Sequence, residues 1–334
     1  MIRRFAPVVS GCETRVMLAT HATVDRLEAS PLTADFVETV PLPDLVGEYR
    51  GQDGGLYGGW SNTPPEAHAE LARQATSRIV PRDARGRPSA QGRIGFLTIG
   101  QSTTRLFYRP FASWTSVRPD RNPRLRLVGA AQDGVVLGQW AFREEPWAEA
   151  RERVAASGLT PAQVQVLWIE VAEIRTWRFG DLPSRMARIS DEIGQVMRRA
   201  SRVFPNLEVA FLTSRPYGGY SNPRLDPEPY AYESGFAVRT AIRRQISGEP
   251  GFAASGAPGS TGGLPVMLWG PYYWADGPKP STNGLSWLPQ DFYDGLHPSR
   301  TGAEKGARVM SDFFANDPFA RPWFLAPEFS ARPS

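Results

Sequence analysis

From residue 93 onward, short uninterrupted apolar runs alternate with amphipathic segments, and this alternation limits the chain to a few folds. Short continuous apolar runs are typical of parallel strands that are buried on both faces. Amphipathic segments between them are typical of helices that cover such a sheet. We predict strands at 94–99, 125–130, 164–171, 207–213 and 265–270, and helices at 102–109, 146–157, 183–203, 231–247 and 300–315. The chain is therefore expected to be an α/β protein with three layers, α/β/α, around a five-stranded parallel sheet.

The residues outside this pattern are expected to form extensions rather than a second core. Residues 1–90 contain many Pro and Gly residues, for example at 51–59 and 62–65, and show little sustained periodicity. Frequent Pro and Gly residues of this kind favour an N-terminal looped extension that packs on the main domain. We therefore divide the chain into the extension 1–90, the main domain 91–317 and a C-terminal tail 318–334.

Composition excludes several classes of protein. The net charge of the 334 residues is only +4, and the arginines are scattered among acidic residues, so we expect no nucleic-acid partner. The single cysteine, Cys12, excludes an intrachain disulfide and a cysteine-based zinc site, and three scattered histidines argue against a histidine-rich metal centre. No apolar run reaches the roughly 18 residues that a membrane-spanning helix needs. No membrane partner, metal or cofactor is therefore expected.

The first residues of the chain are relevant to the cellular compartment, because a signal peptide would lie there. The segment Met1–Arg4 is basic, like the start of a signal peptide, but Gly11, Cys12, Glu13 and Arg15 interrupt the segment that follows. We therefore expect no signal peptide and a cytoplasmic protein by default. The alternative is an exported protein whose leader has been trimmed.

Two separated segments carry residues that suit nucleophilic catalysis. Ser102 follows the first predicted strand directly after Gly100-Gln101, and a serine just beyond a strand is exposed at the sheet edge in α/β hydrolases. Far downstream, Asp294 lies three residues before His297, a spacing that lets the carboxylate fix the imidazole tautomer. A serine hydroxyl attacks poorly unless a histidine removes its proton. The pattern predicts a triad of Ser102, His297 and Asp294.

Each of these residues also has a structural interpretation. A serine at a strand end is often a helix N-cap. His297 could be a loop histidine beside the helix that starts near Ser299, and Asp291 is a rival to Asp294 as the orienting acid. The catalytic interpretation is favoured because segments that follow parallel strands meet at one edge of the sheet.

The order of these motifs, Gly-Gln-Ser at 100–102 and then Asp-x-x-His at 294–297, resembles the SGNH (GDSL-type) hydrolase superfamily, where Gly-Asp-Ser is commoner at the first motif. The resemblance covers about residues 90–317, and the segments 54–57 and 271–277 look like a sparsely characterised bacterial branch. It implies a flavodoxin-like SGNH hydrolase fold. It also implies a serine esterase that hydrolyses short acyl esters, usually acetyl and often on carbohydrates, through a covalent acyl-enzyme and without a metal or cofactor.

The resemblance further implies three donors to the oxyanion. These are the N–H of Ser102, the N–H of a glycine after the second strand, which Gly134 matches, and an asparagine side chain after the third strand. Gly134 is almost as well explained as a turn glycine. Glu173 stands at the third position, where an ionised carboxylate would repel the oxyanion, and losing one such donor costs roughly 10²–10³ in rate. Three alternatives stay open: Glu173 points away, for instance toward Arg175, it is held protonated, or it weakens the activity.

Candidate substrate contacts follow the fourth and fifth predicted strands. Arg215 has a planar fork of donors for a carboxylate or sugar hydroxyls, and the alternative is an ion pair with Glu228 or Glu233. A platform for a sugar ring or an aryl ester is suggested by the aromatic residues Trp269, Tyr272, Tyr273, Trp274 and Trp287, of which Trp269 is better explained by core packing. The expected partner is a small-molecule or glycan ester, and the oligomeric state is left open. The rival hypothesis is a carbohydrate-binding or scaffold protein that keeps this fold while Glu173, in place of the asparagine, has weakened catalysis.

Overall fold

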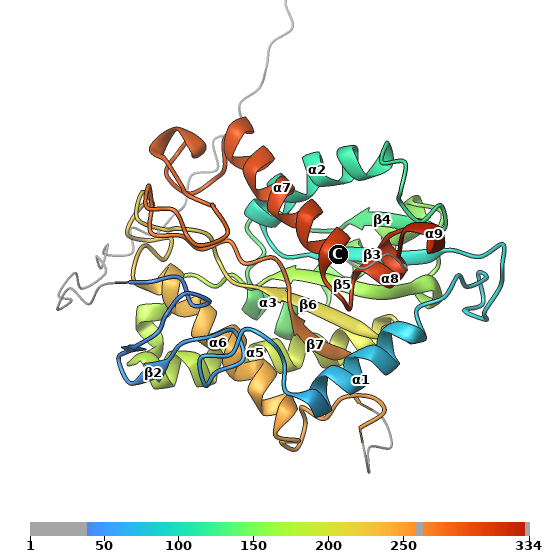
Figure 1. Ribbon diagram of the computed structural model, residues 1–334, viewed down its shortest axis with the longest axis horizontal. Coiled ribbons are helices and arrows are strands. Elements are labelled where there is room, and N and C mark those ends of the chain that lie inside the picture. Colours follow the sequence, from blue (N-terminus) through green and yellow to red (C-terminus); the bar gives the residue numbers. More distant parts are fainter. Residues whose placement is uncertain (1–38, 258–262, 331–334) are drawn as a thin grey trace, which may run out of the picture.

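A computed structural model describes residues 39–257 and 263–330, and its centre is a five-stranded parallel sheet (Figure 1). The strands lie in the order β4-β3-β5-β6-β7, and every neighbouring pair is parallel. Their bounds are β3 Ile94–Ile99, β4 Leu125–Gly129, β5 Val164–Glu170, β6 Val209–Thr213 and β7 Val266–Trp269. The five predicted strands are therefore confirmed, with differences only at their ends.

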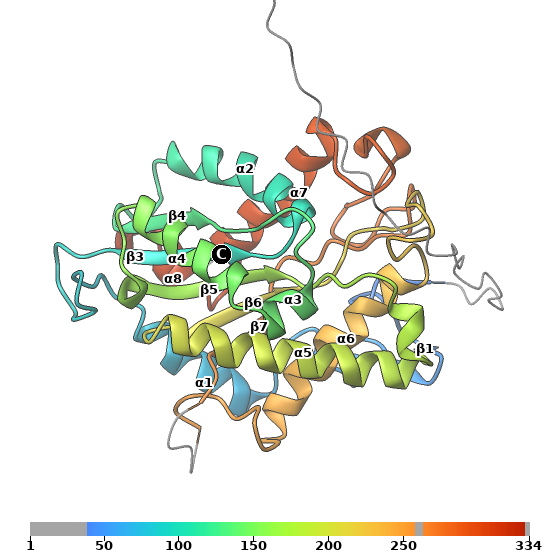
Figure 2. The ribbon, with the colours of Figure 1, turned by 180° about the vertical axis from the view of Figure 1, so that it is seen from behind.

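Helices cover both faces of this sheet, which confirms the three-layer α/β/α architecture (Figures 1 and 2). One face is covered by α1 (Glu66–Ser77), α2 (Ser102–Ser116), α7 (Arg300–Asn316) and α8 (Arg321–Phe324). The other face is covered by α3 (Leu137–Phe142), α4 (Glu145–Ala156), α5 (Leu182–Val203) and α6 (Tyr230–Ile246). The described chain ends with α9 (Pro327–Ser330).

The strand sequences are continuous apolar runs because alternate side chains pack into the core on opposite faces of the sheet. In β3, Phe96 packs edge-to-face against Phe111 of α2 and Phe314 of α7. The next residue, Leu97, belongs to the cluster on the opposite face, together with Ile193 of α5. A strand that is buried on both faces has no solvent side, so no polar alternation is required.

Some regular structure was not predicted from the sequence. In the Pro- and Gly-rich segment before residue 91, α1 packs its alanines into the core, and β1 (Glu48–Tyr49) pairs antiparallel with β2 (Gln52–Asp53). The six-residue helix α3 was also missed. Alanine-rich or very short helices carry too few large apolar residues to give a clear 3.6-residue period. In the tail, Trp323 and Phe324 are buried in the same cluster as α7.

The expectations for Met1–Arg4 and Cys12 lie outside the described residues. Among the helices of the described residues, none is both long enough and apolar enough to cross a lipid bilayer.

Candidate active site

The candidate site lies where the order of the strands reverses. From β3 the chain runs to β4 on one side and then crosses to β5 on the other side. In open parallel sheets, ligands bind beyond the carboxyl ends of the strands at such a reversal. The loops that follow β7 gather at the left-hand end of the sheet in Figure 1.

The serine turn, residues 99–102, joins β3 to α2 and presents Ser102 as the first residue of that helix. Gly100 has φ = 137°, and a Cβ atom there would lie 2.3 Å from the hydroxyl oxygen of Thr104, so the turn requires glycine. The carbonyl oxygen of Gly100 accepts hydrogen bonds from the Gln132 N–H at 3.0 Å and from the Trp140 indole at 3.2 Å. The core beneath the turn therefore fixes the position of Ser102.

The structure brings Ser102, His297 and Asp294 into one hydrogen-bonded series. Oγ of Ser102 lies 2.8 Å from Nε2 of His297, and Nδ1 of His297 lies 2.7 Å from Oδ2 of Asp294. With the proton on Nδ1 donated to Asp294, Nε2 is an acceptor for the serine hydroxyl. This is the arrangement in which a histidine can activate a serine nucleophile.

The histidine loop, residues 292–298, is shaped by hydrogen bonds within itself. Oδ1 of Asp294 accepts the backbone N–H of Leu296 at 3.0 Å and that of His297 at 2.7 Å. Gly295 has φ = 84°, and a Cβ atom there would lie 1.9 Å from the carbonyl oxygen of Tyr220. Partial burial alone would raise the pKa of Asp294, but the hydrogen bonds from His297 and Leu296 outweigh it and lower the pKa. The carboxylate therefore stays ionised near neutral pH.

Asp291, the rival orienting acid, has a structural role instead. Its side chain is buried, forms an ion pair with Lys305 of α7 and accepts the Leu288 N–H at 2.8 Å. These contacts tie the segment before the histidine loop to α7. Of the two acids, Asp294 is the one that contacts His297.

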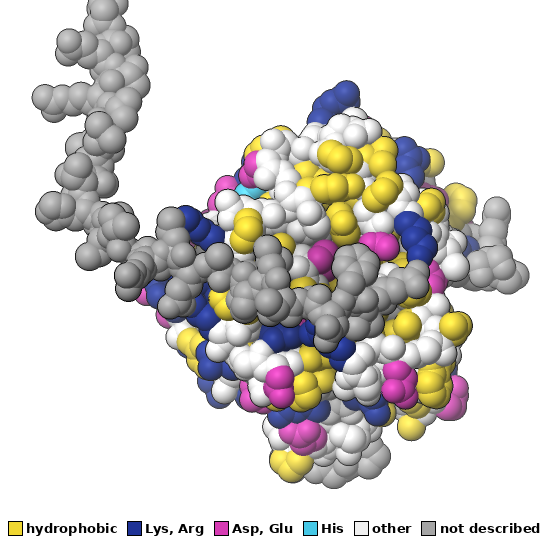
Figure 3. Space-filling view, turned by 90° about the vertical axis from the view of Figure 1, so that its left-hand side faces the viewer, with side chains coloured by type: hydrophobic (Ala, Val, Ile, Leu, Met, Phe, Trp, Pro, Cys, Tyr) yellow, Lys and Arg dark blue, Asp and Glu magenta, His cyan; other side chains and the backbone are white. Residues whose placement is uncertain are grey.

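Tyr293 is a residue of the site that the sequence did not single out. Its ring stacks on His297 with the ring centroids 5.5 Å apart and an angle of 11° between the planes, while Tyr293 stays 66% exposed. Figure 3 shows this end of the molecule, where a histidine side chain reaches the surface beside acidic side chains. Its position directly before the Asp-x-x-His motif is the only signal in the sequence that could have found it.

The glycine turn, residues 132–135, follows β4 and carries Gly134. The Val135 N–H donates to the Gln132 carbonyl oxygen at 3.3 Å, and Gly134 has φ = 74°, a conformation that favours glycine. Next to Gly134, Asp133 accepts two hydrogen bonds from the guanidinium of Arg105, at 2.8 and 2.7 Å. Because Arg105 is in the first turn of α2, this ion pair ties the glycine turn to the helix that begins at the serine turn.

Glu173 accepts hydrogen bonds from the backbone with both carboxylate oxygens. Oε2 accepts the Gly138 N–H at 2.8 Å, and Oε1 accepts the Ile174 N–H at 2.9 Å. The side chain is therefore directed at the start of α3 and is not paired with Arg175. Burial raises the pKa of Glu173 to about 7. The proposed contact of Glu173 with Arg175 is therefore wrong. Because the pKa of Glu173 is about 7, a protonated Glu173 is accessible near neutral pH.

Arg215 does not form the predicted substrate contact or ion pair. The residue is 3% exposed, and its guanidinium donates to the carbonyl oxygens of Leu225 at 3.0 Å and Asp226 at 3.2 Å. A buried guanidinium needs acceptors for its N–H groups, and these backbone carbonyls supply them in place of Glu228 or Glu233. Arg215 therefore holds the loop that follows β6.

The predicted aromatic platform after β7 is wrong, because these rings are buried. Tyr272 is 7% exposed, and its hydroxyl accepts the Leu42 N–H at 2.9 Å. Trp274 is 1% exposed, and its indole donates to Oε1 of Glu228 at 2.8 Å. The other members of the predicted platform, Trp269, Tyr273 and Trp287, are buried as well. Among the residues that the structure describes, Tyr293 is an exposed ring beside the catalytic candidates.

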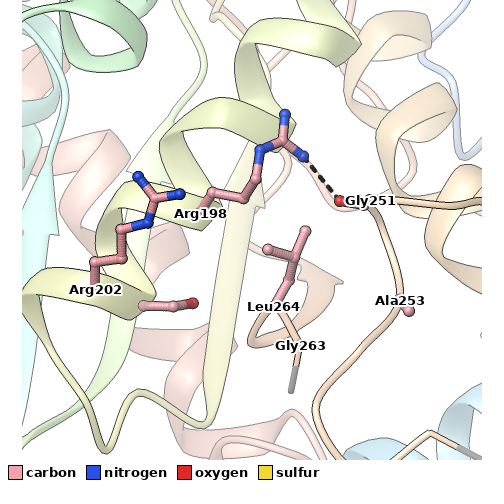
Figure 4. A pocket seen from close by; sticks show the side chains of 7 residues that line it. Arg198, Arg202, Gly251, Ala253, Gly263 and Leu264 are labelled. Carbon is pink, nitrogen blue, oxygen red and sulfur yellow. Dashed lines mark hydrogen bonds between the residues drawn. The ribbon is translucent and has the colours of Figure 1, made fainter. Parts of the chain in front are cut away.

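A hollow of about 340 Å³ is lined by the last turns of α5, which end just before β6 begins, so it lies at the opposite end of the sheet. Figure 4 shows the side chains that line it. Its lining is Arg198, Ser201, Arg202, Gly251, Ala253, Gly263 and Leu264. It is separate from the serine turn. Among the described residues, no group of three or more His, Cys, Asp and Glu side chains is placed to hold a metal ion.

Comparison with known proteins finds no matching family model and no matching curated protein. Solved structures with a similar fold include a GDSL-like lipase from Bacteroides thetaiotaomicron, with 13% identity, a TM-score of 0.38, and coverage of 74% of this chain and 95% of that chain. An extracellular lipase from Streptomyces rimosus has 12% identity and a TM-score of 0.34, over 66% of this chain and 99% of that chain. Phospholipase A1 from Streptomyces albidoflavus has 11% identity and a TM-score of 0.31, over 66% and 100%. Similarity at this level does not identify an activity.

Proposed function

We propose that this chain is a serine ester hydrolase of the SGNH (GDSL-type) superfamily. The observation that carries the proposal is the hydrogen-bonded series of Ser102, His297 and Asp294 at the strand reversal of the parallel sheet. A purely structural role for the serine is less suitable, because Gln101, not Ser102, is at the N-cap position of α2. The hydroxyl is thus available for His297.

In the proposed reaction, Nε2 of His297 removes the hydroxyl proton of Ser102 while Oγ attacks the ester carbonyl carbon. The tetrahedral intermediate collapses, the bond to the alcohol oxygen breaks, and His297 gives its proton to the leaving oxygen. A water molecule then attacks the acyl-enzyme in the same way, which releases the acid and restores the serine. Asp294 orients the imidazole and stabilises its charged form.

The oxyanion is proposed to bind the backbone N–H groups of Ser102 and Gly134. The first N–H groups of a helix have no partner within the helix, and Ser102 is the first residue of α2. A helix N-terminus also favours negative charge. Glu173 is directed at the start of α3, and we assign it no donor role. Two donors rather than three predict a slower enzyme than a complete site, by roughly 10²–10³.

We propose short acyl esters of carbohydrates, acetyl esters first, as the substrates. The outer face of Tyr293 is a flat exposed ring beside His297, which is the kind of surface on which a sugar ring stacks. Nearby, Arg105 and Asp133 present a polar pair that suits sugar hydroxyls. The rings after β7 are packed in the core, so they do not supply a channel for a long acyl chain.

Hydrolysis of p-nitrophenyl esters from acetate to octanoate tests the proposed function. Wild type should hydrolyse the acetate fastest, and Ser102→Ala should lower kcat/KM by at least ~10³, since triad members act as a unit. Ser116→Ala, a serine near the other end of the same helix, should leave activity unchanged. A Ser102→Ala variant as active as wild type would overturn the nucleophile. A wild type that is inactive on every ester would favour the carbohydrate-binding rival.

The sugar substrate is tested with two acetates that differ only in the alcohol. Tyr293→Ala should raise KM for an acetylated xylo-oligosaccharide by roughly 3–10-fold, the range expected for one aromatic contact, and should leave ethyl acetate almost unaffected. Tyr293→Phe should behave like wild type on both esters. Trp60→Ala, which removes an exposed ring elsewhere, is the control. Equal changes for both acetates would mean that Tyr293 acts through His297 and not on a sugar.

A further inference from the structure

Several segments of the site either form hydrogen bonds with α3 or lead directly into its start. The N–H of Leu137 donates to the carbonyl oxygen of Ala172 at 2.9 Å, and the next N–H, that of Gly138, donates to Glu173 at 2.8 Å. From the same helix, the indole of Trp140 donates to the carbonyl oxygen in the serine turn at 3.2 Å. The glycine turn leads directly into this helix. The position of α3 therefore affects the positions of the serine turn and the glycine turn, which carry the proposed oxyanion donors.

A second buried carboxyl group lies behind Glu173. Glu192 of α5 is 2% exposed, and its side chain is within hydrogen-bonding reach of Glu173. A Cβ atom at Gly138 would lie 3.2 Å from Oε2 of Glu173 and 3.7 Å from Oε1 of Glu192, so this glycine leaves room for both carboxyl groups. Arg188 donates to Oε1 of Glu192 at 2.7 Å. Oε2 of Glu192 is buried and has no hydrogen-bond partner within the part of the chain that the structure describes.

Two adjacent buried carboxylates repel each other unless one of them keeps a proton. A single shared proton converts the repulsion into an O–H···O hydrogen bond and gives the unpartnered oxygen of Glu192 its partner. Within residues 39–257 and 263–330, the other charged groups near the pair are Arg188 and Asp191 of α5 and Asp226 of the loop after β6, while α3 contributes no charged side chain. Burial raises the pKa of Glu173 to about 7 and also raises that of Glu192.

We propose that Glu173 and Glu192 share a proton and, as a pair, position the start of α3, and with it the glycine turn and the serine turn, for the reaction at Ser102. This inference rests on the proposed ester hydrolysis. It makes Glu173 a positioning residue at the place where the resemblance implies an oxyanion donor. The carboxylate accepts the Gly138 N–H, and the proton holds that carboxylate against α5.

The pH dependence of kcat on p-nitrophenyl acetate tests the pair. In wild type, kcat should fall as the pH rises above about 7, because the shared proton is then lost and the two carboxylates repel. Glu173→Gln keeps an acceptor for Gly138 and adds a donor for Glu192, and it loses only the local contact with the Ile174 N–H, so this fall should disappear while kcat at pH 6 stays within about 3-fold of wild type. Glu173→Leu has neither group and should lower kcat roughly 10²-fold, with KM nearly unchanged, as for a misplaced catalytic group.

Asp317→Asn is the matched control. Burial also raises the pKa of Asp317, to about 6, but this residue follows the far end of α7 and should leave the pH profile as it is in wild type. Hydrogen exchange of the segment 131–142 gives a readout without turnover. Exchange there, corrected for the intrinsic effect of pH, should speed up in Glu173→Leu and in wild type above about pH 7, but not in Glu173→Gln.

Each outcome has a separate meaning for the two proposals. If Ser102-dependent hydrolysis is present but Glu173→Gln keeps the wild-type pH profile and Glu173→Leu keeps the wild-type kcat, the positioning role is overturned. If wild type has no Ser102-dependent hydrolysis, the proposed function fails, and the exchange data alone decide whether the pair holds α3. Unchanged exchange in Glu173→Leu overturns the inference in either case.

Discussion

The serine turn and the histidine loop meet at one end of the sheet, yet different parts of the structure hold them in place. The serine turn runs into residues that are almost fully buried, with Thr103 and Thr104 at 1% and 0% exposure. In the histidine loop, the side chains of His297 and Asp294 are 23% and 43% exposed. The first segment is positioned by the core of the fold, and the second by hydrogen bonds that backbone N–H groups of the loop donate to its own aspartate, Asp294.

This difference means that stability and activity should separate between the two regions. A change in the serine turn disturbs the packing of β3 and α2, so the whole domain should lose stability together with activity. A change in the histidine loop removes few buried contacts, so activity should fall while the fold remains.

The largest effect is expected for the orienting acid. Asp294→Asn should lower kcat by about 10²–10⁴, because an amide no longer favours the required imidazole tautomer, with little change in melting temperature. Asp291→Asn should do the opposite, because it removes the charge of the buried partner in an ion pair with the part-exposed Lys305, and losing a charged hydrogen bond of this kind costs about 1–3 kcal/mol. The kcat and the melting temperature of both variants test this expected contrast. Equal losses of activity and stability in the two variants would contradict the separate roles of Asp294 in catalysis and Asp291 in stability.

Glycine substitutions sharpen the comparison. In Gly295→Ala, the new Cβ would meet the Tyr220 carbonyl oxygen at 1.9 Å, so the loop must move and carry His297 with it. A displacement of about 1 Å at a catalytic group costs roughly 10² in kcat. Gly100→Ala, whose Cβ would meet Thr104 at 2.3 Å inside the core, should lower the melting temperature more than Gly295→Ala. A larger loss of stability in Gly295→Ala would show that the histidine loop is part of the cooperative core.

A smaller effect is expected for the ion pair that ties the glycine turn to α2. Arg105→Ala should lower kcat by about 3–10-fold and barely change stability, because exposed ion pairs contribute only about 0–1 kcal/mol. Arg118→Ala removes an ion pair with the same two-bond geometry, to Asp120 beyond the other end of α2, and should change neither quantity. If Arg105→Ala hydrolyses esters as fast as Arg118→Ala, the pair with Asp133 does not position the glycine turn.

The smallest effect on catalysis is expected for Glu170, behind the serine turn. It is 1% exposed and accepts the Thr104 hydroxyl at 3.1 Å, and burial raises its pKa to about 7. Because this pKa is higher in the folded chain than in the unfolded chain, Glu170 should reduce stability progressively as the pH rises from about 4.5 to 7. Glu170→Gln should therefore flatten the fall in melting temperature over that range while kcat changes little. An unchanged slope would mean that other groups cause the fall.

The fold and the positions of the catalytic candidates were predictable from the sequence for a simple reason. Strands that are buried on both faces leave an unbroken apolar run, and β3 ends directly before the serine turn. The spacing of Asp294 and His297 allowed their contact within one short loop. These features depend on residues that are close in the sequence, so a pattern can reveal them.

The environment of the remaining side chains was less predictable, because distant segments decide it. Tyr272 is buried because the segment around Leu42, 230 residues away, covers its hydroxyl. Glu173 contacts Gly138 and Glu192, and neither partner is marked by a motif. Arg215 donates hydrogen bonds to backbone carbonyl oxygens, and because every residue has such a carbonyl, the sequence does not mark these partners. Whether an aromatic or charged residue faces solvent is therefore a property of the whole fold.

The central claim is that Ser102 is a nucleophile activated by His297, and covalent labelling tests it most directly. Wild type should be treated with a fluorophosphonate, which forms a stable adduct with activated serines, and the modified residue identified by peptide mass spectrometry. One adduct on Ser102 is predicted, absent in Ser102→Ala and formed at least ~10²-fold more slowly in His297→Ala. Labelling of Ser102→Ala at the wild-type rate, or a wild type that stays unmodified at Ser102, would contradict the account.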